Sequence, residues 1–529
     1  MKAAGLLIAC SILCVGCAAS RGRAVPEDTG WLTYSGDYSG KRYSDQASIH
    51  AGNVRHLRPE WVRQLDGPGK KFEATPLVRD GVMYLSEGPS RVSALNVVTG
   101  RPLWIFDRPL PVGTRTMYSV NRGVALLGTR LYWGTLDAHL IALNATTGHL
   151  VWDVEAAENS RGYSITAAPL AIDGRIIVGY SGGEMNLPGF LDAFDPESGR
   201  RLWRQPTIPA EGEPARKTWP ARSPVSPGGA PTWMTGTYDP VSDLLFWGTG
   251  NPGIDFNGRH REGENLYSNC LLAVEPKTGM IRWSFQTTPH DLHDFDANGI
   301  PILSELDLGG RRRKVVLQAN KNGFLYVLDR ESGEFLAGHP FTELNWTEGL
   351  DARGKPRPLA EATPTPRGAT VFPGSLGATK WWSPTLDAES GRIFIPVNET
   401  GEEFFSRDAL PPPIPGAILF GGGARSLDRL ETQGSVRALD PASGQVAWTF
   451  PIPEGTAGGL LSTAGRLLFG STAAGYFFAL DSRDGRPLWR FPTGGFINAA
   501  PITYSYRGRQ HVSVASQGAL FDFALPESP

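Results

Sequence analysis

The sequence contains little of what marks haem, disulfide-rich or nucleic-acid-binding proteins. Four of its 529 residues are cysteine, and three of them fall within the first 17 residues. No Cys-x-x-Cys-His motif is present, so the sequence offers no site for covalently attached haem. The 51 Lys and Arg residues are balanced by 53 Asp and Glu residues, and the densest basic run is Arg311–Lys314. A formal charge of −2 gives no field that would hold a polyanion, so nucleic-acid binding is not expected.

Helical periodicity is also lacking, because no stretch shows a convincing amphipathic helix pattern. The chain instead contains 64 Gly and 43 Pro, together about a fifth of its residues, spread along its length with 15 Trp. Hydrophobic residues make up 40% and charged residues 20%, enough to bury a large core. This composition favours a folded, soluble all-β protein with many short strands joined by turns.

The N-terminal region has the pattern of a secretory signal. Lys2 precedes an apolar run over residues 3–15, which is too short to span a bilayer comfortably and ends in small residues. We therefore expect an exported protein with a signal peptide over residues 1–16, a linker over 17–30 and a folded domain over 31–529.

The end of this signal is similar to a bacterial lipoprotein signal, in which Cys17 would be lipidated and become the first mature residue. Cys14 departs from that pattern, because it stands where an aliphatic or small residue is usual. Ordinary cleavage after Ala18–Ala19 is the alternative. In both cases Cys10 and Cys14 leave with the signal, and Cys270 is the only free thiol expected in the mature chain. No intramolecular disulfide can then form.

An eleven-residue pattern organises the rest of the chain. It begins with Ala, contains an acidic or amide residue followed by Thr or Ser and Gly, and ends in Trp; the copies cover residues 94–104, 142–152, 193–203, 273–283, 438–448 and 479–489. A degenerate copy opens at Val327 and has Ala337 in the Trp position, and Trp61 supplies a copy without its first half. The pattern therefore occurs eight times.

Each copy reads as a strand, a tight turn and a second strand that places Trp on a sheet face. The Trp positions are 41 to 54 residues apart except for two gaps of 80 and 111, so most units have room for four short strands. This spacing predicts an eight-bladed β-propeller with tryptophan docking, and a linear solenoid is the rival architecture. The long gaps should hold insertions, which include residues 206–231, 338–373 and 410–423.

From Trp31 to about Gly518 the sequence resembles the quinoprotein alcohol dehydrogenases. The resemblance includes the opening segment Trp31–Ser44 and many of the repeated motifs. These proteins are periplasmic eight-bladed propellers that bind pyrroloquinoline quinone (PQQ) and a metal ion on the propeller axis. The outer-membrane barrel-assembly lipoprotein has a similar propeller but binds protein, so the polar residues of the central site must discriminate between the two.

The resemblance implies a set of cofactor-binding residues. Glu73 would hydrogen-bond the quinone, and Arg122 would hold a carboxylate and a ring oxygen, because a guanidinium donates two parallel hydrogen bonds to planar anionic groups. Trp233 would stack under the flat ring, and Lys321 would lie near the reactive oxygens. The full cofactor set is Glu73, Arg122, Thr166, Ser181, Gly182, Gly183, Trp233 and Lys321.

The resemblance also implies a metal site and a general base. Its ligands would be Glu184, Asn251, Asp294 and Asp296, and Asp294 would also take the hydroxyl proton while a hydride leaves for the quinone. Such hard oxygen donors suit Ca²⁺. Asp296 resembles the acid of the lanthanide-dependent branch, although some quinoprotein glucose dehydrogenases have an acid there too. His290 and His293 could tune the base or line the substrate cavity, and a histidine metal site is not expected.

The sequence departs from the family pattern around the cofactor. Thr116–Met117 replace the adjacent cysteines that form a disulfide over the quinone in many members. His293 replaces a Trp before the base, and Lys380 an Asn before Trp381. Residues 187–189 lack the usual arginine, and Ala457 replaces another Trp. These changes surround the cofactor faces and the substrate entrance. They are compatible with the expected chemistry, but they prevent a substrate from being inferred from individual relatives.

We expect an exported, lipid-anchored, PQQ-dependent dehydrogenase that oxidises an alcohol or aldose hydroxyl in the periplasm. It would use Ca²⁺ or a lanthanide and pass electrons to a separate acceptor such as a cytochrome c. The alternative is a non-catalytic propeller lipoprotein that acts as a protein-binding scaffold.

Overall fold

The computed structural model describes Met1 and residues 28–65, 71–427 and 434–527. Apart from Met1, the expected signal peptide lies outside these residues, as do the lipidation site at Cys17 and most of the linker. The helices in the described part are short 3₁₀ turns: η1 (Val54–His56), η2 (Asn159–Arg161), η3 (Gly183–Met185), η4 (Pro214–Thr218) and η5 (Ala360–Ala362). Within these ranges no helix is long and apolar enough to cross a membrane. The expectation of an all-β protein without substantial helices is confirmed.

Antiparallel sheets of four strands follow one another along the first half of the chain, and we number them as blades. The strands are β3 (Leu77–Arg79), β4 (Val82–Ser86), β5 (Arg91–Asn96) and β6 (Pro102–Asp107) in blade 1; β7 (Ala125–Leu127), β8 (Arg130–Gly134), β9 (His139–Asn144) and β10 (Leu150–Glu155) in blade 2; β11 (Leu170–Ile172), β12 (Arg175–Gly179), β13 (Phe190–Phe194) and β14 (Arg201–Pro206) in blade 3; and β16 (Thr237–Asp239), β17 (Leu244–Gly248), β19 (Cys270–Val274) and β20 (Ile281–Gln286) in blade 4.

The second half repeats this arrangement. The strands are β21 (Ile302–Leu308), β22 (Arg311–Ala319), β23 (Phe324–Asp329) and β24 (Phe335–Pro340) in blade 5; β28 (Thr385–Leu386), β29 (Ile393–Asn398), β32 (Gly434–Leu439) and β33 (Val446–Ile452) in blade 6; β34 (Thr456–Thr463), β35 (Leu467–Thr472), β36 (Tyr476–Asp481) and β37 (Pro487–Pro492), with β1 (Tyr43–Ser44) added in parallel to β34, in blade 7; and β38 (Ile502–Tyr506), β39 (Arg509–Ser516), β40 (Ala519–Ala524) and β2 (Arg58–Gln64) in blade 8.

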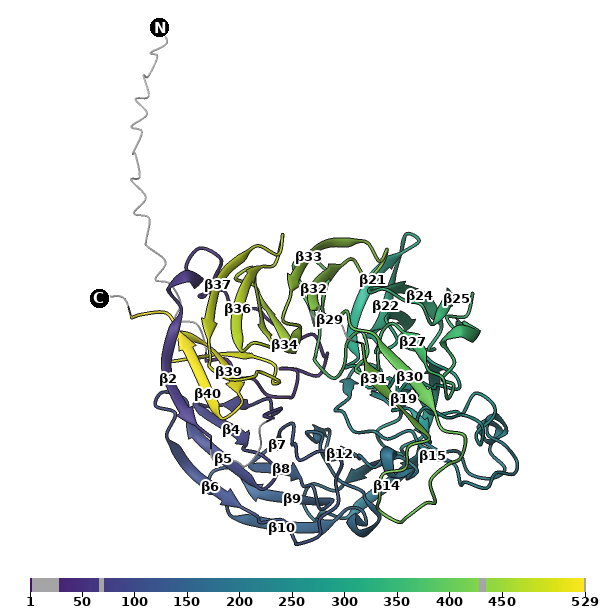
Figure 1. Ribbon diagram of the computed structural model, residues 1–529. Helices are drawn as coiled ribbons and strands as arrows, with labels where there is room; N and C mark the ends of the chain where they lie inside the picture. Colours follow the sequence, from purple (N-terminus) through teal and green to yellow (C-terminus); the bar gives the residue numbers. More distant parts are fainter. Residues whose placement is uncertain (2–27, 66–70, 428–433, 528–529) are drawn as a thin grey trace.

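The blades lie around a common centre, and strands from both ends of the chain complete blade 8 (Figure 1). β2 pairs antiparallel with β40, with Val62 opposite Phe521. This pairing joins the first strands of the chain to the last and closes the ring. The described residues thus form eight sheets of four or five strands, consistent with the predicted eight-bladed propeller rather than a linear solenoid.

The repeated Trp residues dock on neighbouring blades. The Trp61 Nε1–H donates to the carbonyl oxygen of Val97 at 2.8 Å, and Trp104 makes the same contact with Ala145 at 2.9 Å. A side chain at Gly100 would meet the Trp61 ring, since a Cβ there would lie 2.5 Å from it. The same indole-to-carbonyl contact is made by Trp152, Trp203, Trp283, Trp448 and Trp489. The glycine of each turn thus leaves room for the indole of the preceding unit.

The degenerate sixth unit uses a different residue. Ala337 occupies the Trp position, but His339, two residues further along β24, packs against Gly444 of the next unit, where a Cβ would lie 2.4 Å from its ring. An imidazole therefore takes the place of the missing indole.

The insertions form small extra sheets outside the eight blades. These are the pair β15 (Gly228–Gly229) and β18 (Pro252–Gly253), the pair β25 (Thr347–Leu350) and β26 (Pro356–Pro358), and the three-stranded sheet of β27 (Ala369–Val371), β30 (Glu402–Ser406) and β31 (Gly422–Ser426). They fall in the two longest gaps between Trp positions, as predicted.

Candidate active site

A cavity of about 250 Å³ brings together residues from blades 1 to 6. Of the twelve predicted site residues, ten line it: Glu73, Arg122, Thr166, Ser181, Glu184, Trp233, Asn251, Asp294, Asp296 and Lys321. Its size is near the lower limit of pockets that hold a small organic ligand. Residues more than 200 positions apart in sequence thus share one site, because the segments leading into successive blades converge on it.

Backbone hydrogen bonds between neighbouring segments place the first of these side chains. The Thr75 N–H donates to the carbonyl of Arg122 at 3.1 Å, and the Arg122 N–H donates to the carbonyl of Thr166 at 3.0 Å. Three consecutive blades therefore present Glu73, Arg122 and Thr166 side by side.

Arg122 is held between two indoles. Its guanidinium carbon lies 4.9 Å from the Trp233 ring centre and 5.0 Å from that of Trp381, and Nη2 lies 2.8 Å from Glu73 Oε2. Cation–π contacts of this kind stabilise a buried guanidinium. Nε and Nη1 of Arg122 are buried and have no hydrogen-bond partner among the described residues. Arg122 thus retains donors for a ligand.

Asn298 fixes the Trp233 indole. With its amide oriented so that donors face acceptors, Asn298 Oδ1 accepts from Trp233 Nε1 at 2.7 Å and Nδ2 donates to the Gly248 carbonyl at 2.7 Å. The indole plane at the cavity wall is therefore set before any ligand binds.

Thr166 and Ser181 form a hydroxyl pair, with their Oγ atoms 2.8 Å apart. Gly182 and Gly183, also predicted to contact the cofactor, do not line the cavity but form the turn into η3 that presents Glu184. Gly182 has φ +140°, and a Cβ at Gly183 would lie 2.9 Å from Pro231. Both positions therefore require glycine for the backbone path.

The loop that carries Asp294 is shaped by Asp291. The Asp291 carboxylate accepts from the N–H of His293 at 2.8 Å and from that of Phe295 at 2.7 Å. These bonds hold the turn in which Asp294 adopts φ +63°, and the Asp294 side chain remains 29% exposed. Asp294 is thus presented to the cavity on a fixed backbone.

Carboxylates and one ammonium form the polar end of the cavity. Lys321 Nζ lies 3.3 Å from Asp294 Oδ1 and 3.1 Å from Asp296 Oδ2. Asp296 Oδ1 also accepts from the Asn251 N–H at 3.0 Å, and Asn251 Nδ2 donates to Asp255 Oδ1 at 2.7 Å. Three of the four predicted metal ligands, Asn251, Asp294 and Asp296, are therefore joined through Lys321 and the Asn251 N–H, with Asp255 behind them.

Burial, with a contribution from neighbouring carboxylates, raises the pKa values of three acid groups at this end of the cavity. Burial raises the pKa of Asp294 well above its usual range, and repulsion from Asp296 adds to this against the attraction of Lys321. Burial and the neighbouring Glu184 raise the pKa of Asp255 to about 8. Burial also raises the pKa of Glu184, and Asp296 contributes to the same shift. Burial and mutual repulsion thus both disfavour the ionised forms of these carboxyl groups.

The donor chemistry fits a hard cation. Glu184, Asn251, Asp294 and Asp296 offer carboxylate and amide oxygens, which Ca²⁺ and lanthanide ions prefer. In the described ranges no three His, Cys, Asp or Glu side chains stand close enough to make a metal centre by themselves. The candidate set includes one amide, and Lys321 holds two of its carboxylates.

The departures from the family pattern fall on the cavity wall in three cases. Thr116, Met117 and Lys380 all line the cavity. Lys380 Nζ lies 4.7 Å from the Trp382 ring centre, and burial, with repulsion from Lys321, lowers the pKa of Lys380 to about 8. The cavity therefore has a second ammonium that is not tied to the Asp294 and Asp296 carboxylates.

His290 and His293 do not line the cavity. His293 Nε2 lies 2.7 Å from the Ala362 carbonyl, and its ring packs against Phe295 and Phe404. His290 Nδ1 lies 3.0 Å from the Gly263 carbonyl. Of their two suggested roles, lining the substrate cavity is wrong, because both rings are engaged in packing and loop contacts.

Sequence reasoning missed Asp255, Asn298 and Tyr118. Asp255 lies four residues after Asn251 and Asn298 two residues after Asp296, so their proximity to predicted site residues was a usable signal. Tyr118 lines the cavity, and burial, together with Glu184, raises its pKa to about 12. It directly follows Thr116–Met117.

The fold and the cavity together define a β-propeller with a charged, indole-walled ligand site where its blades converge. Residues 31–345 match the family described as "Glucose/ethanol/alcohol dehydrogenase, beta-propeller domain", and residues 432–522 match the one described as "Outer membrane protein assembly factor BamB". The chain is 38% identical to the quinoprotein alcohol dehydrogenase PedH of Pseudomonas putida over 505 residues, which cover 90% of this chain and 84% of that protein.

Two solved structures agree with this. The quinohemoprotein alcohol dehydrogenase ADHIIG of Pseudomonas putida HK5 superposes with a TM-score of 0.88 at 32% identity, over 95% of this chain and 81% of that one. A europium-containing methanol dehydrogenase superposes with a TM-score of 0.87 at 27% identity, over 94% and 98%. The chain therefore belongs to the PQQ-dependent alcohol dehydrogenase family.

Proposed function

We propose that this chain oxidises a small alcohol through a cofactor held in the axial cavity, with Asp294 accepting the hydroxyl proton. One observation carries the proposal. Arg122, a cation held between two indoles, lines the same cavity as the carboxylates of Asp294 and Asp296. When bound there, PQQ supplies the hydride acceptor and the metal ion a Lewis acid.

The Arg122 end suits a flat anionic quinone. The Trp233 indole, fixed by Asn298, offers a planar apolar surface. Two donors of Arg122 have no partner among the described residues, and its guanidinium geometry matches carboxylate and quinone oxygens. Lys380 adds a second positive charge. These groups would bind and orient the ring, and together they limit how it can rotate.

The Asp294 end suits proton abstraction. Asp294 is exposed toward the cavity on a backbone held by Asp291, so its carboxylate can reach a substrate hydroxyl. Lys321 lies within 3.3 Å of it and stabilises the ionised form that a general base requires. Tyr118 and Met117 line the same cavity and would limit the access of water to this pair.

We infer that Glu184, Asn251, Asp294 and Asp296 hold the metal ion. The raised pKa values of Glu184 and Asp294 reflect acid groups that a multivalent cation would stabilise as carboxylates. Ca²⁺ and a lanthanide are both candidates, and the similarity to a europium-containing methanol dehydrogenase supports testing the second. Asp296 supplies the additional carboxylate that a trivalent ion favours.

The decisive experiment is reconstitution of the purified protein with PQQ and either Ca²⁺ or La³⁺, followed by assays with a panel of alcohols and sugars and an artificial dye. Tight one-to-one PQQ binding and metal-dependent oxidation of alcohols would support the proposal. Absence of PQQ binding with both metals would contradict it and favour the protein-binding scaffold.

We further propose export to the periplasm, a lipid anchor at Cys17 and electron transfer to a separate acceptor such as a cytochrome c. The apolar run before Cys17 supports the first two. Cys17→Ser should release the protein from the membrane fraction, because the acyl chains attached at Cys17 would form the anchor. A wild-type protein that is wholly soluble, with a mature N-terminus near Ser20, would contradict the anchor.

A further inference from the structure

The loop between β6 and β7 covers one side of the cavity. We call residues 108–119 the cover loop; its last residues, Thr116, Met117 and Tyr118, line the cavity. Much of the loop is exposed, and Tyr118 itself is 51% exposed. The described residues contain one cysteine, the buried Cys270, so no disulfide between them can hold the loop. Its position depends on non-covalent contacts.

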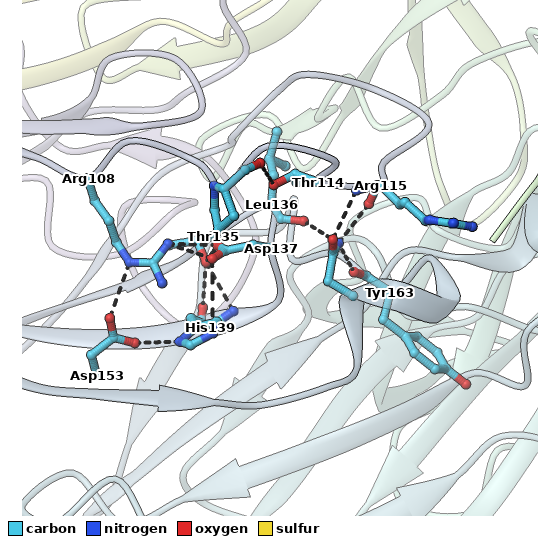
Figure 2. Close-up of polar contacts among 11 residues, drawn as sticks. Arg108, Thr114, Arg115, Thr135, Leu136, Asp137, His139, Asp153 and Tyr163 are labelled. Carbon is cyan, nitrogen blue, oxygen red and sulfur yellow. Dashed lines mark hydrogen bonds and ion pairs between the residues drawn. The ribbon is translucent and has the colours of Figure 1, made fainter.

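The first anchor of the cover loop is Arg108. Its Nη1 donates to both oxygens of Asp137, at 2.8 and 2.7 Å, and its Nε donates to Asp153 at 3.2 Å (Figure 2). Asp137 follows β8, and Asp153 lies in β10. Arg108 thus fixes the start of the loop to blade 2. The eight residues between Arg108 and Met117 need a further contact to hold them over the cavity.

The second anchor is the Asn159 side chain. Asn159 Oδ1 accepts from the Arg115 N–H at 2.9 Å, and Nδ2 lies 2.8 Å from the Arg115 carbonyl. Nδ2 is also 3.0 Å from the Leu136 carbonyl and 2.8 Å from that of Tyr163. Figure 2 shows contacts from Arg115, Leu136 and Tyr163 converging on one point. A single amide therefore satisfies both backbone groups of Arg115 and ties them to blade 2.

These contacts bear directly on the cavity. Arg115 immediately precedes Thr116, whose Oγ1 lies 3.4 Å from Ser164 Oγ. Ser164 follows Tyr163 and leads to Thr166 on the cavity wall. The Arg115 side chain also donates to the Pro415 carbonyl, in the proline-rich insertion. Loss of the Asn159 amide would remove both backbone anchors of Arg115, the residue next to Thr116 on the cavity wall, and leave only the side-chain contacts of Arg115 and Thr116 there.

We propose that Asn159 is a positioning residue that holds the cover loop over the cavity and thereby slows release of the bound cofactor. The identity of that cofactor rests on the proposed function, whereas the contacts of Asn159 do not. Asn159 lies outside the cavity lining, so it acts through Arg115 and Met117 rather than by touching the ligand.

The first test uses the cofactor-free protein. In Asn159→Ala, hydrogen exchange at the amides of residues 111–119 should be at least about fivefold faster, because the Arg115 N–H loses its acceptor. Asn144→Ala is the matched control: Asn144 Oδ1 accepts from the N–H groups of Thr146 and Thr147 in an exposed turn of the same blade. The control should leave exchange in the cover loop unchanged.

The second test measures the dissociation rate of PQQ from the holoprotein. The holoprotein is mixed rapidly with an excess of apoenzyme, which captures the released PQQ. Asn159→Ala should release PQQ at least about fivefold faster than wild type, while kcat at saturating PQQ stays within about twofold. Asn159→Asp keeps the side-chain volume but cannot donate to the three carbonyls, so it should also accelerate release if the alanine variant folds poorly.

The outcomes are distinct. Faster exchange together with faster release supports the proposal. Unchanged exchange of the cover loop in Asn159→Ala overturns it. Faster exchange with an unchanged release rate also overturns it, because the loop would then move without affecting retention of the ligand. If wild type binds no PQQ at all, the proposed function fails, and the exchange experiment alone decides whether Asn159 holds the loop.

Discussion

The Arg122 guanidinium lies 2.8 Å from the Glu73 carboxylate, and both groups are buried. Their charges compensate each other, so neither is left isolated in the protein interior. The pair also fixes the direction of the remaining Arg122 donors. A ligand that accepts from them meets a preformed site.

Arg122→Lys tests the planar part of this site. Lysine keeps the charge beside Glu73 but cannot stack between Trp233 and Trp381 or donate two parallel hydrogen bonds. We expect PQQ affinity to fall at least about tenfold while the melting temperature changes little, measured by fluorescence titration and thermal unfolding. Equal affinity in the two proteins would remove Arg122 from the binding site.

Asp294→Asn tests the general base. The amide keeps an oxygen donor and nearly the same volume but cannot accept the hydroxyl proton, so turnover should fall by about 10²–10⁴. PQQ binding should stay within about threefold of wild type. Asp80→Asn is a suitable control, because Asp80 also has a positive φ, of 52°, but lies in the exposed turn between β3 and β4. Near-normal turnover in Asp294→Asn would refute the proposed mechanism.

Asp296→Asn tests the choice of metal. Asp296 accepts from the Asn251 N–H and contacts Lys321, so removal of the whole side chain would disturb both; the amide preserves an acceptor. Loss of one negative charge should weaken a trivalent ion more than a divalent one. We expect La³⁺-supported activity to fall at least about tenfold more than Ca²⁺-supported activity. Equal losses would indicate that both ions share this ligand.

Lys380 predicts a pH dependence of cofactor binding. Its pKa is lowered to about 8, first by burial and then by Lys321, so it is charged below that pH and neutral above it. The affinity for an anionic quinone should therefore fall as pH rises from about 7 to about 9.5, by roughly fivefold or more. Tyr118, with a pKa of about 12, stays neutral over this range. Lys380→Met should bind more weakly at neutral pH and show a flat profile; a parallel decline in both proteins would assign the effect to another group.

Most of the fold could be predicted because it is encoded in a local repeat. The turn from Asn96 to Gly100 and the indole of Trp61 recur with little change, and each copy needs only its neighbour to pack. His339 escaped prediction because an imidazole fills the space beside Gly444 from a position of β24 that is not the Trp position of the repeat.

The candidate site could be predicted only where the neighbouring residues form a motif that identifies the functional side chain. Arg122 and Asp294 stand in recognisable surroundings, and the structure brings them to one cavity. Asp255 and Asn159 act through contacts made across loops, with Asn251 and Arg115 respectively. Such contacts depend on the three-dimensional path of the backbone, which no local pattern in the sequence specifies.

The closure of blade 8 has a consequence for the order in which the fold can form, because β2 and β40 lie far apart in the sequence. β2 is complete by Gln64, but its partner β40 spans Ala519–Ala524, so during synthesis β2 carries an unpaired strand edge until more than 450 further residues have been made. Exposed edges of this kind invite association with other chains. A premature stop only a few residues before Ala519 would leave every residue lining the cavity in place along the sequence, yet it would remove the strand that shuts the ring. Loss of function from C-terminal truncation would therefore arise from failed assembly of the fold, and damage to the chemistry need not be invoked.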